Sequence, residues 1–166
     1  RDQLRTAVWL RGQGIAAFTM LAVAFAAAGK VTDLAEAHLY ADEIVHAETS
    51  PYQRIVITRW KDDLRLHLNN NLQFSSRDEY RYHEALVHPA LATLPGARRV
   101  LVLGGGDGLA VREILKYPQV ESVTLVDLDP AMTKLFSTAS SLRALNGDAL
   151  NAPRVKVINA DALQWL

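Results

Sequence analysis

A short apolar run that stops at three consecutive glycines constrains the fold of this chain more than any other stretch. Residues 99–103 (RVLVL) have the composition of a strand, and residues 109–115 (LAVREIL) carry apolar side chains at helical spacing. A strand, a glycine-rich turn and a helix in this order open a nucleotide-binding α/β unit, because glycine tolerates a positive φ and lets a ligand approach the backbone. A glycine turn that binds nothing is the alternative for this stretch alone.

The spacing of the glycines argues against a dinucleotide site. The loop has Gly104, Gly106 and Gly108 with Asp107 between the last two, whereas a G-x-G-x-x-G fingerprint would need glycine in place of Leu109. A carboxylate in this loop would also repel a phosphate. Both features favour a nucleoside lying over the loop rather than a pyrophosphate at the helix N-terminus.

The rest of the C-terminal half alternates between the two kinds of element. Residues 122–127 and 155–158 are predicted strands, and Pro130 is predicted to start a helix that runs to about residue 144. This alternation predicts an α/β fold with a Rossmann-like, doubly wound parallel sheet, which is incomplete because only three strands are present. We expect residues 77–166 to form the first half of this nucleoside-binding domain.

Acidic side chains follow all three predicted strands, and ligands of such sheets bind at the carboxyl ends of the strands. Asp127 lies where a carboxylate can accept both ribose hydroxyls, while Asp129 is predicted to face away and cap the helix. At the third strand, Asp161 can accept from an adenine amino group while the Ala162 N–H meets a ring nitrogen; an N-cap aspartate is the alternative. With Asp107, these acids imply a neutral or cationic ligand.

Residues 42–76 are predicted to form a small antiparallel β-meander. The period-two stretches 43–48, 54–60 and 64–68 are the expected strands, with turns at 50–51, 61–63 and 69–71. A helix is then expected from an N-cap at Ser75 and Ser76, ending at residues 94–96.

Residues 12–29 carry no charge and lie between Arg11 and Lys30. A membrane-spanning helix needs about 17–25 residues, so we predict a span here within an N-terminal segment of residues 1–41. A secretory signal, with Arg1 and Arg5 preceding it, and a buried soluble helix are the alternatives. The arginines on its N-terminal side would place the rest of the chain outside, so the orientation stays open.

The composition excludes several classes of function. The chain has 18 basic and 18 acidic residues and no cysteine. A balanced charge gives no surface for nucleic acid, and the lack of thiols rules out disulfides and thiolate metal sites. Four of the five histidines, His38, His46, His67 and His88, are interpreted as structural. No metal site is expected, because none of them lies at metal-ligand spacing from a second ligand.

Five motifs taken together resemble the spermidine synthases, the polyamine aminopropyltransferases. They are Tyr52-Gln53, residues 77–84 (RDEYRYHE), residues 103–108 (LGGGDG), residues 126–129 (VDLD) and Asp161-Ala162. The resemblance runs from about residue 43 to the end, and it implies a Rossmann-like fold of the class I methyltransferase type. The apolar stretch before it looks like the membrane-anchored bacterial branch. This implies a bacterial cell membrane location with the catalytic domain on the cytoplasmic side, and a homodimer.

The resemblance also implies roles for single residues. Gln53 matches a glutamine that contacts the thioadenosine end of the nucleotide, and Asp127 matches the ribose-binding acid, which is more often Glu in the family. Asp161 and Ala162 match the adenine-binding pair. On the polyamine and aminopropyl side the matching residues are Tyr82, His83 and Asp107.

The implied reaction transfers an aminopropyl group from decarboxylated S-adenosylmethionine to putrescine, giving spermidine and methylthioadenosine without a further cofactor. The family's catalytic aspartate follows a fourth strand, beyond Leu166. We therefore expect this chain to be the front part of a longer enzyme and to be inactive alone. The alternatives are an S-adenosylmethionine-dependent polyamine N-methyltransferase and a non-catalytic membrane protein that binds nucleoside or polyamine.

Overall fold

The computed structural model describes the backbone of residues 2–166 and the side chains of residues 9, 12–29 and 39–166. Arg1, one of the flanking arginines considered above, lies outside the described residues. The chain forms two compact units, Arg1–Glu43 and Ile44–Leu166. The domain boundaries expected at 41/42 and 76/77 stay predictions.

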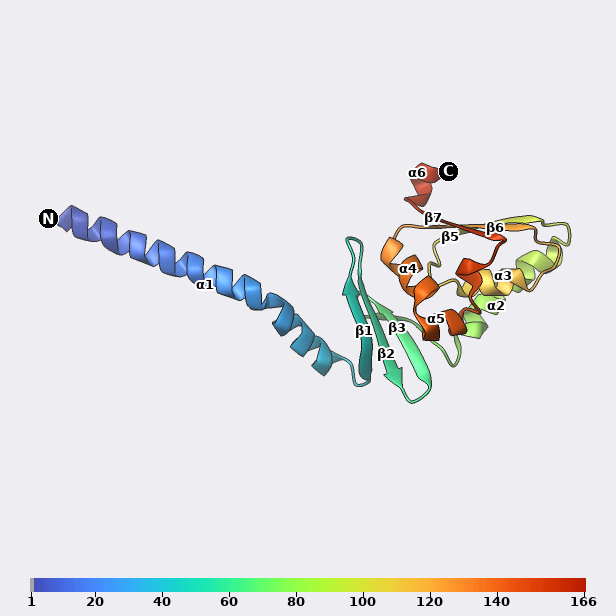
Figure 1. Cartoon of the computed structure of the whole chain (residues 1–166), viewed down its shortest axis with the longest axis horizontal. Coiled ribbons are helices and arrows are strands. Elements are labelled where there is room, and N and C mark those ends of the chain that lie inside the picture. Colours follow the sequence, from blue (N-terminus) through green and yellow to red (C-terminus); the bar gives the residue numbers. More distant parts are fainter. Residues whose placement is uncertain (1) are drawn as a thin grey trace. The chain divides into compact units, whose positions relative to one another are not determined.

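The first unit is a single long helix, α1 (Asp2–Leu39), drawn in blue in Figure 1. Its Gly12–Gly29 window is long and apolar enough to cross a membrane, and none of it is buried. Phe18 and Phe25 are 75% and 86% exposed. The helix itself is confirmed, and it continues through residues 30–39, whereas a membrane span rests on length and composition alone.

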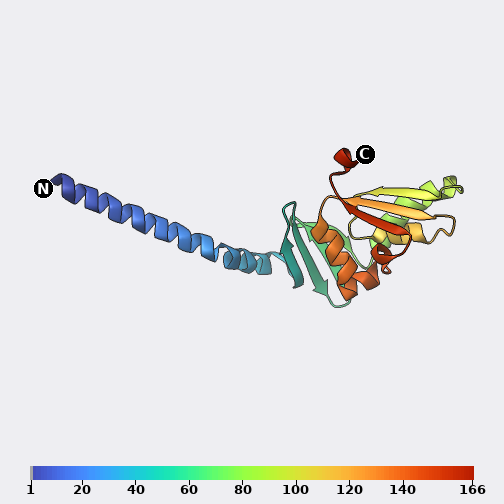
Figure 2. The same cartoon turned by 45° about the horizontal axis from the view of Figure 1, so that its top comes forward.

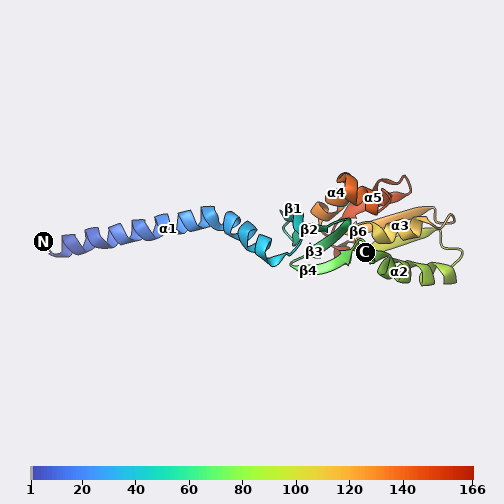
Figure 3. The same cartoon turned by 90° about the horizontal axis from the view of Figure 1, so that it is seen from below.

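The second unit begins with a four-stranded sheet in the order β1-β2-β3-β4, which is visible from below in Figure 3. Its strands are β1 (Glu43–Thr49), β2 (Arg54–Trp60), β3 (Asp63–Leu68) and β4 (Asn71–Ser75). The sequence analysis missed β4. Asn69 and Asn70 have φ of 49° and 67°, the left-handed pair that a two-residue hairpin turn requires, so the chain turns back at once into a further antiparallel strand.

The predicted serine cap of the next helix is wrong. Helix α2 (Glu79–Thr93) has Asp78 at its N-cap. Ser75 and Ser76 instead donate their hydroxyls to Oδ1 of Asp63, at 2.7 and 3.1 Å. The Arg65 Nε donates to the other oxygen at 2.8 Å. The buried Asp63 carboxylate therefore holds both serines at the end of the four-stranded sheet, away from the N-terminus of α2.

We expect Asp63→Ala to lower the free energy of unfolding by about 3 kcal/mol, because it removes a buried carboxylate with three hydrogen bonds. Burial alone would raise the pKa of Asp63, but the bonds from Ser75, Arg65 and Ser76 outweigh it and lower the pKa. The stabilisation is therefore present above the pKa of the unfolded state and is lost as the pH falls through the folded-state pKa. Urea unfolding at neutral and acid pH measures both effects. Asp62→Ala, on the exposed neighbour, is the control, and an equal loss there would contradict the account.

The parallel sheet is as predicted. Strands β5 (Arg99–Leu103), β6 (Ser122–Asp127) and β7 (Val155–Asn159) are adjacent, in the order β5-β6-β7. Leu103 pairs with Val126, and Val126 pairs with Ile158. Because the strands are parallel and in this register, their carboxyl ends meet at one edge. A mixed α/β fold with a parallel sheet, a preceding meander and an N-terminal helix is confirmed.

The helices that connect the strands lie on one face of the parallel sheet, as Figures 1 and 2 show. They are α3 (Leu109–Leu115), α4 (Pro130–Thr138) and α5 (Ser140–Leu145). Both crossovers step in the same direction, so the right-handed rule places their helices together. The chain closes with a 3₁₀ turn (Ala149–Asn151) and α6 (Ala162–Trp165).

The helix predicted from residue 130 to about 144 is broken at Ala139, which has an extended conformation with ψ of 120°. The hydroxyls of Ser137 and Thr138 donate to the Lys134 carbonyl at 3.1 and 2.7 Å. Such side-chain bonds compete with helical backbone bonds, which explains why the helix ends here.

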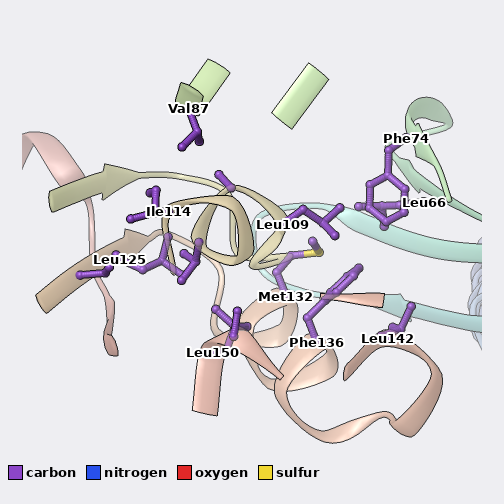
Figure 4. Close-up of a cluster of buried hydrophobic side chains, with 14 of the residues drawn as sticks. Leu66, Phe74, Val87, Leu109, Ile114, Leu125, Met132, Phe136, Leu142 and Leu150 are labelled. Atoms are coloured by element: carbon purple, nitrogen blue, oxygen red, sulfur yellow. The ribbon is translucent and has the colours of Figure 1, made fainter. Parts of the chain in front are cut away.

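One apolar core joins the meander to the parallel sheet (Figure 4). Leu66 and Phe74 come from the meander, and Leu109 and Phe136 come from α3 and α4. The rings of Phe74 and Phe136 are 6.1 Å apart at 69°, an edge-to-face contact worth about 0.5–1.5 kcal/mol beyond burial. The two sheets are therefore packed as one body around the space between them.

Candidate functional site

A cavity of about 1040 Å³ lies at the carboxyl ends of β5 and β6, between the meander and the start of α2. Residues from distant parts of the sequence line it together, and every site residue suggested by the sequence is among them. These are Gln53, Tyr82, His83, Gly104, Gly106, Asp107, Asp127, Asp161 and Ala162. The structure thus brings the whole predicted set to one place, while the binding role of each stays a prediction.

The glycine loop is built around Asp127. Gly104, Gly105 and Gly108 have φ of 77–78°, a conformation that other residues rarely adopt. The Gly106 N–H donates to Oδ2 of Asp127 at 2.8 Å, and the Asp129 N–H donates to Oδ1 at 2.8 Å. Each carboxylate oxygen keeps acceptor capacity, so Asp127 is both fixed by the loop and able to accept from a ligand hydroxyl.

Asp129 lines the cavity, which corrects the prediction that it faces away. Strand β6 ends at Asp127, so the alternation of a strand no longer applies two residues later. Its Oδ1 caps α4 by accepting from the Ala131 N–H at 2.9 Å, as predicted. Its Oδ2 accepts from the Gln53 Nε2 at 2.8 Å and from the Ser50 hydroxyl at 2.7 Å. Asp129 therefore ties the meander to the start of α4 at the edge of the cavity.

Asp107 is a cavity acid whose pKa is raised in the folded protein. Its Oδ1 accepts from the Leu109 N–H at 2.8 Å. Burial raises the pKa of Asp107, the charges of Asp127 and Glu79 raise it further, and the Leu109 bond and His83 oppose the change. Burial disfavours the ionised form of this carboxyl, and a cation that enters the cavity would stabilise that form again.

His83 is held by two residues that the sequence analysis did not single out. Its Nδ1 lies 2.8 Å from the Glu79 carbonyl and 2.8 Å from Glu79 Oε2. Arg112 donates to the same carboxylate from two nitrogens, at 2.8 and 3.1 Å. Burial alone would lower the pKa of Arg112, but its bonds to Glu79 and Glu113 raise it. The four-residue spacing of Glu79 and His83 was the available signal; the pairing with Arg112 is long-range.

Asp161 and Ala162 are at the entry to α6. Oδ1 of Asp161 accepts from the Leu163 N–H at 2.9 Å, so the N-cap alternative considered for this aspartate is what the structure shows. Its second oxygen has no hydrogen-bond partner among the described residues. A capping aspartate that also lines the cavity can still bind a ligand through that oxygen.

His88 is less isolated than the sequence analysis assumed. Ligand atoms of Glu84, His88 and Glu113 lie within 4.8 Å of one another. However, the Lys116 ammonium is 2.5 Å from Glu113 Oε2 and 4.0 Å from Glu84 Oε1. An ammonium already supplies the positive charge of this cluster, which we therefore describe as a structural ion-pair network.

The fold and the cavity define a Rossmann-like α/β protein with an acidic site. Residues 79–166 match the family model described as the spermine/spermidine synthase domain. The chain belongs to this family.

Curated relatives and solved structures agree with this assignment. Polyamine aminopropyltransferase 2 of Ralstonia nicotianae is 64% identical over 100% of this chain, and that of Leptospira interrogans is 57% identical over 95%. The chain spans about a third of their length, 33% and 32%. The crystal structure of spermidine synthase from Thermotoga maritima aligns with a TM-score of 0.69 and 27% identity, covering 74% of this chain and 43% of that one. A spermidine synthase in complex with the transition-state analogue AdoDATO aligns equally well, with a TM-score of 0.69.

Proposed function

We propose that this chain supplies the nucleoside-binding part of an aminopropyltransferase that moves an aminopropyl group from decarboxylated S-adenosylmethionine to putrescine. The observation that carries the proposal is the charge of the cavity. Six carboxylates line it against a single arginine, Arg81, and a single histidine, His83. The carboxylates are Asp78, Glu79, Asp107, Asp127, Asp129 and Asp161. The names of the relatives and of the aligned structures point to the same reaction.

The proposed substrates fit this charge. Decarboxylated S-adenosylmethionine carries a sulfonium and an ammonium but no carboxylate, and putrescine is a dication. Asp107, which lines the cavity and has a raised pKa, is the proposed partner of the aminopropyl ammonium, whereas the carboxylate of intact S-adenosylmethionine would meet like charge there. The ribose and adenine are then contacted by Gln53, Asp127, Asp161 and Ala162.

In the transfer, a deprotonated amine of putrescine attacks the carbon beside the sulfonium. The new C–N bond forms as the C–S bond breaks, and methylthioadenosine leaves as a neutral thioether. The amine must first lose a proton to a base. We propose that the residues described here bind and orient the donor.

The direct test is product formation by the full-length protein. Incubated with decarboxylated S-adenosylmethionine and putrescine, it should form spermidine and methylthioadenosine in equal amounts, measured by mass spectrometry. With intact S-adenosylmethionine it should form no methylated polyamine. Methylated product without spermidine would identify an N-methyltransferase instead, and binding without either product would leave a non-catalytic binding protein.

We also propose that the protein associates with the bacterial membrane through residues 12–29, with the catalytic domain on the cytoplasmic side, and that it is a homodimer. The uncharged, exposed face of α1 supports the first point. Deleting residues 2–41 should move the protein from the membrane fraction to the soluble fraction. Retention of the deleted protein in membranes would contradict the anchor.

A further inference from the structure

We propose that Glu79 and Arg112 are positioning residues that lock the imidazole of His83 in one tautomer, with the proton on Nδ1 and the lone pair of Nε2 available to a substrate ammonium. The inference rests on the proposed function for the identity of the ammonium. It names the group that would accept a hydrogen bond from this cation beside Asp107.

The tautomer follows from the partners of Nδ1. This nitrogen is 2.8 Å from two oxygens of Glu79, the backbone carbonyl and Oε2. Both oxygens are acceptors, so Nδ1 must carry the hydrogen. His83 and Glu79 are each only 6% exposed, so water does not compete for these bonds. A neutral imidazole has one N–H, which leaves Nε2 as an acceptor.

The Glu79 carboxylate is itself held in place from α3. Arg112 donates to Glu79 Oε1 from Nη1 and to Oε2 from Nη2, the two-point geometry that fixes the plane of a carboxylate. The same guanidinium donates to the Leu145 carbonyl at 2.8 Å and to Glu113 Oε1 at 2.9 Å. Two hydrogen bonds therefore anchor the guanidinium that orients Glu79, and α3 begins directly after the glycine loop.

The remaining edge of the His83 ring is free for a ligand. Among the described residues, Nε2 has no hydrogen-bond partner, and His83 lines the same cavity as Asp107. An ammonium offers only donors. The ammonium can donate to an unprotonated Nε2 but not to an Nε2 that carries a hydrogen. The tautomer therefore decides whether His83 attracts or repels the substrate ammonium.

The alternative is that Glu79 and Arg112 only staple α2 to α3. The variant Glu79→Gln distinguishes the stapling role from the positioning role. Glutamine has the size of glutamate, but its single side-chain oxygen must serve both the His83 Nδ1–H and the Arg112 guanidinium. If Arg112 takes that oxygen, the amide NH₂ faces Nδ1 and opposes its proton. If His83 keeps it, Arg112 loses a partner. In the first arrangement only the Glu79 backbone carbonyl still favours the proton on Nδ1, and in the second Arg112 no longer fixes the side chain. Either arrangement therefore weakens the lock, which a stapling role does not require.

The test uses the full-length protein labelled with ¹⁵N-histidine, with His83 assigned by its loss in His83→Gln. Ring ¹⁵N shifts should show Nδ1 protonated in the wild type, and a mixed or reversed tautomer in Glu79→Gln. Titration should show roughly ten-fold weaker binding of decarboxylated S-adenosylmethionine by Glu79→Gln, with methylthioadenosine almost unchanged. Glu121→Gln, which breaks an exposed arginine–glutamate pair with Arg98, should change neither readout.

A wild-type His83 protonated on Nε2 would overturn the inference without any variant having to fold. Equal weakening of both ligands in Glu79→Gln would also overturn it in favour of the stapling role. The tautomer is read without substrate, so its outcome stands even if the wild type fails to bind decarboxylated S-adenosylmethionine. That failure would count against the proposed function instead.

Discussion

Asp107→Asn is expected to weaken binding of decarboxylated S-adenosylmethionine by about ten- to a hundred-fold and to leave methylthioadenosine almost unaffected. A hydrogen bond to a charged group is worth roughly 1.5–3 kcal/mol, which gives this range. Methylthioadenosine lacks the amine, and the contacts proposed for its ribose and adenine, from Gln53, Asp127 and Asp161, are unchanged. Asparagine keeps an oxygen for the Leu109 N–H that now bonds Oδ1. Calorimetric titration of both ligands into the full-length wild type and variant measures the difference.

The same substitution should stabilise the free protein at neutral pH. The pKa of Asp107 is raised in the folded state, chiefly by burial. Its stabilising contribution is therefore present below the unfolded-state pKa and is lost as the pH rises through the folded-state pKa. Asparagine carries no such charge, so the melting temperature of Asp107→Asn should exceed that of the wild type at pH 7 and approach it in acid. A less stable variant that binds all ligands equally poorly would mean that Asp107 only shapes the glycine turn.

Gly106→Ala is expected to lower nucleoside affinity by about a hundred-fold, since small displacements of binding groups have effects of this order. An added Cβ would lie 2.9 Å from both Cγ and Oδ2 of Asp127, closer than such contacts occur. Gly106 does not have a positive φ, so the effect would come from pushing the Asp127 carboxylate away rather than from backbone strain. Titration with methylthioadenosine measures it.

Two other glycines provide matched controls. A Cβ at Gly96 would meet nothing within 4 Å, and Gly96→Ala should bind normally. A Cβ at Gly104 would also meet nothing, but its φ of 78° makes alanine strained there. Gly104→Ala should therefore lose about 1 kcal/mol of stability while keeping more nucleoside affinity than Gly106→Ala. Normal binding by Gly106→Ala would show that Asp127 does not hold the nucleoside.

Local patterns were enough to predict the parallel sheet and the gathering of its acids. The strand before Gly104 and the strands that end at Asp127 and Asn159 follow from apolar runs bounded by turn residues, and the carboxyl ends of parallel strands must meet. Asp107, Asp127 and Asp161 were therefore predictable as neighbours. Their roles in binding rest on the family resemblance.

What the sequence could not predict depends on long-range partners. The turn at Asn69 and Asn70 was predicted, but the five-residue strand that follows it, β4, was not. Ser75 and Ser76 match a helix cap in sequence, but their hydroxyls donate to the buried Asp63 carboxylate instead. Asp129 was predicted to face away from the site because side chains alternate along a strand, but β6 ends at Asp127.

The pairing of Glu79 with Arg112 spans 33 positions. No local period indicates such a contact, which exists only after α2 and α3 have packed together. The residues proposed to bind a ligand carry motif signals, whereas the pairing of Glu79 with Arg112 is found only in the folded structure.

The most direct test of the account is the preference of the full-length wild type between decarboxylated and intact S-adenosylmethionine. The two ligands differ only in the carboxylate, so a calorimetric comparison under identical conditions isolates the effect of the acidic cavity. The account predicts that the decarboxylated form binds at least about ten-fold more tightly, since the carboxylate would face Asp107. Equal or tighter binding of intact S-adenosylmethionine would contradict the assignment of this site to aminopropyl transfer.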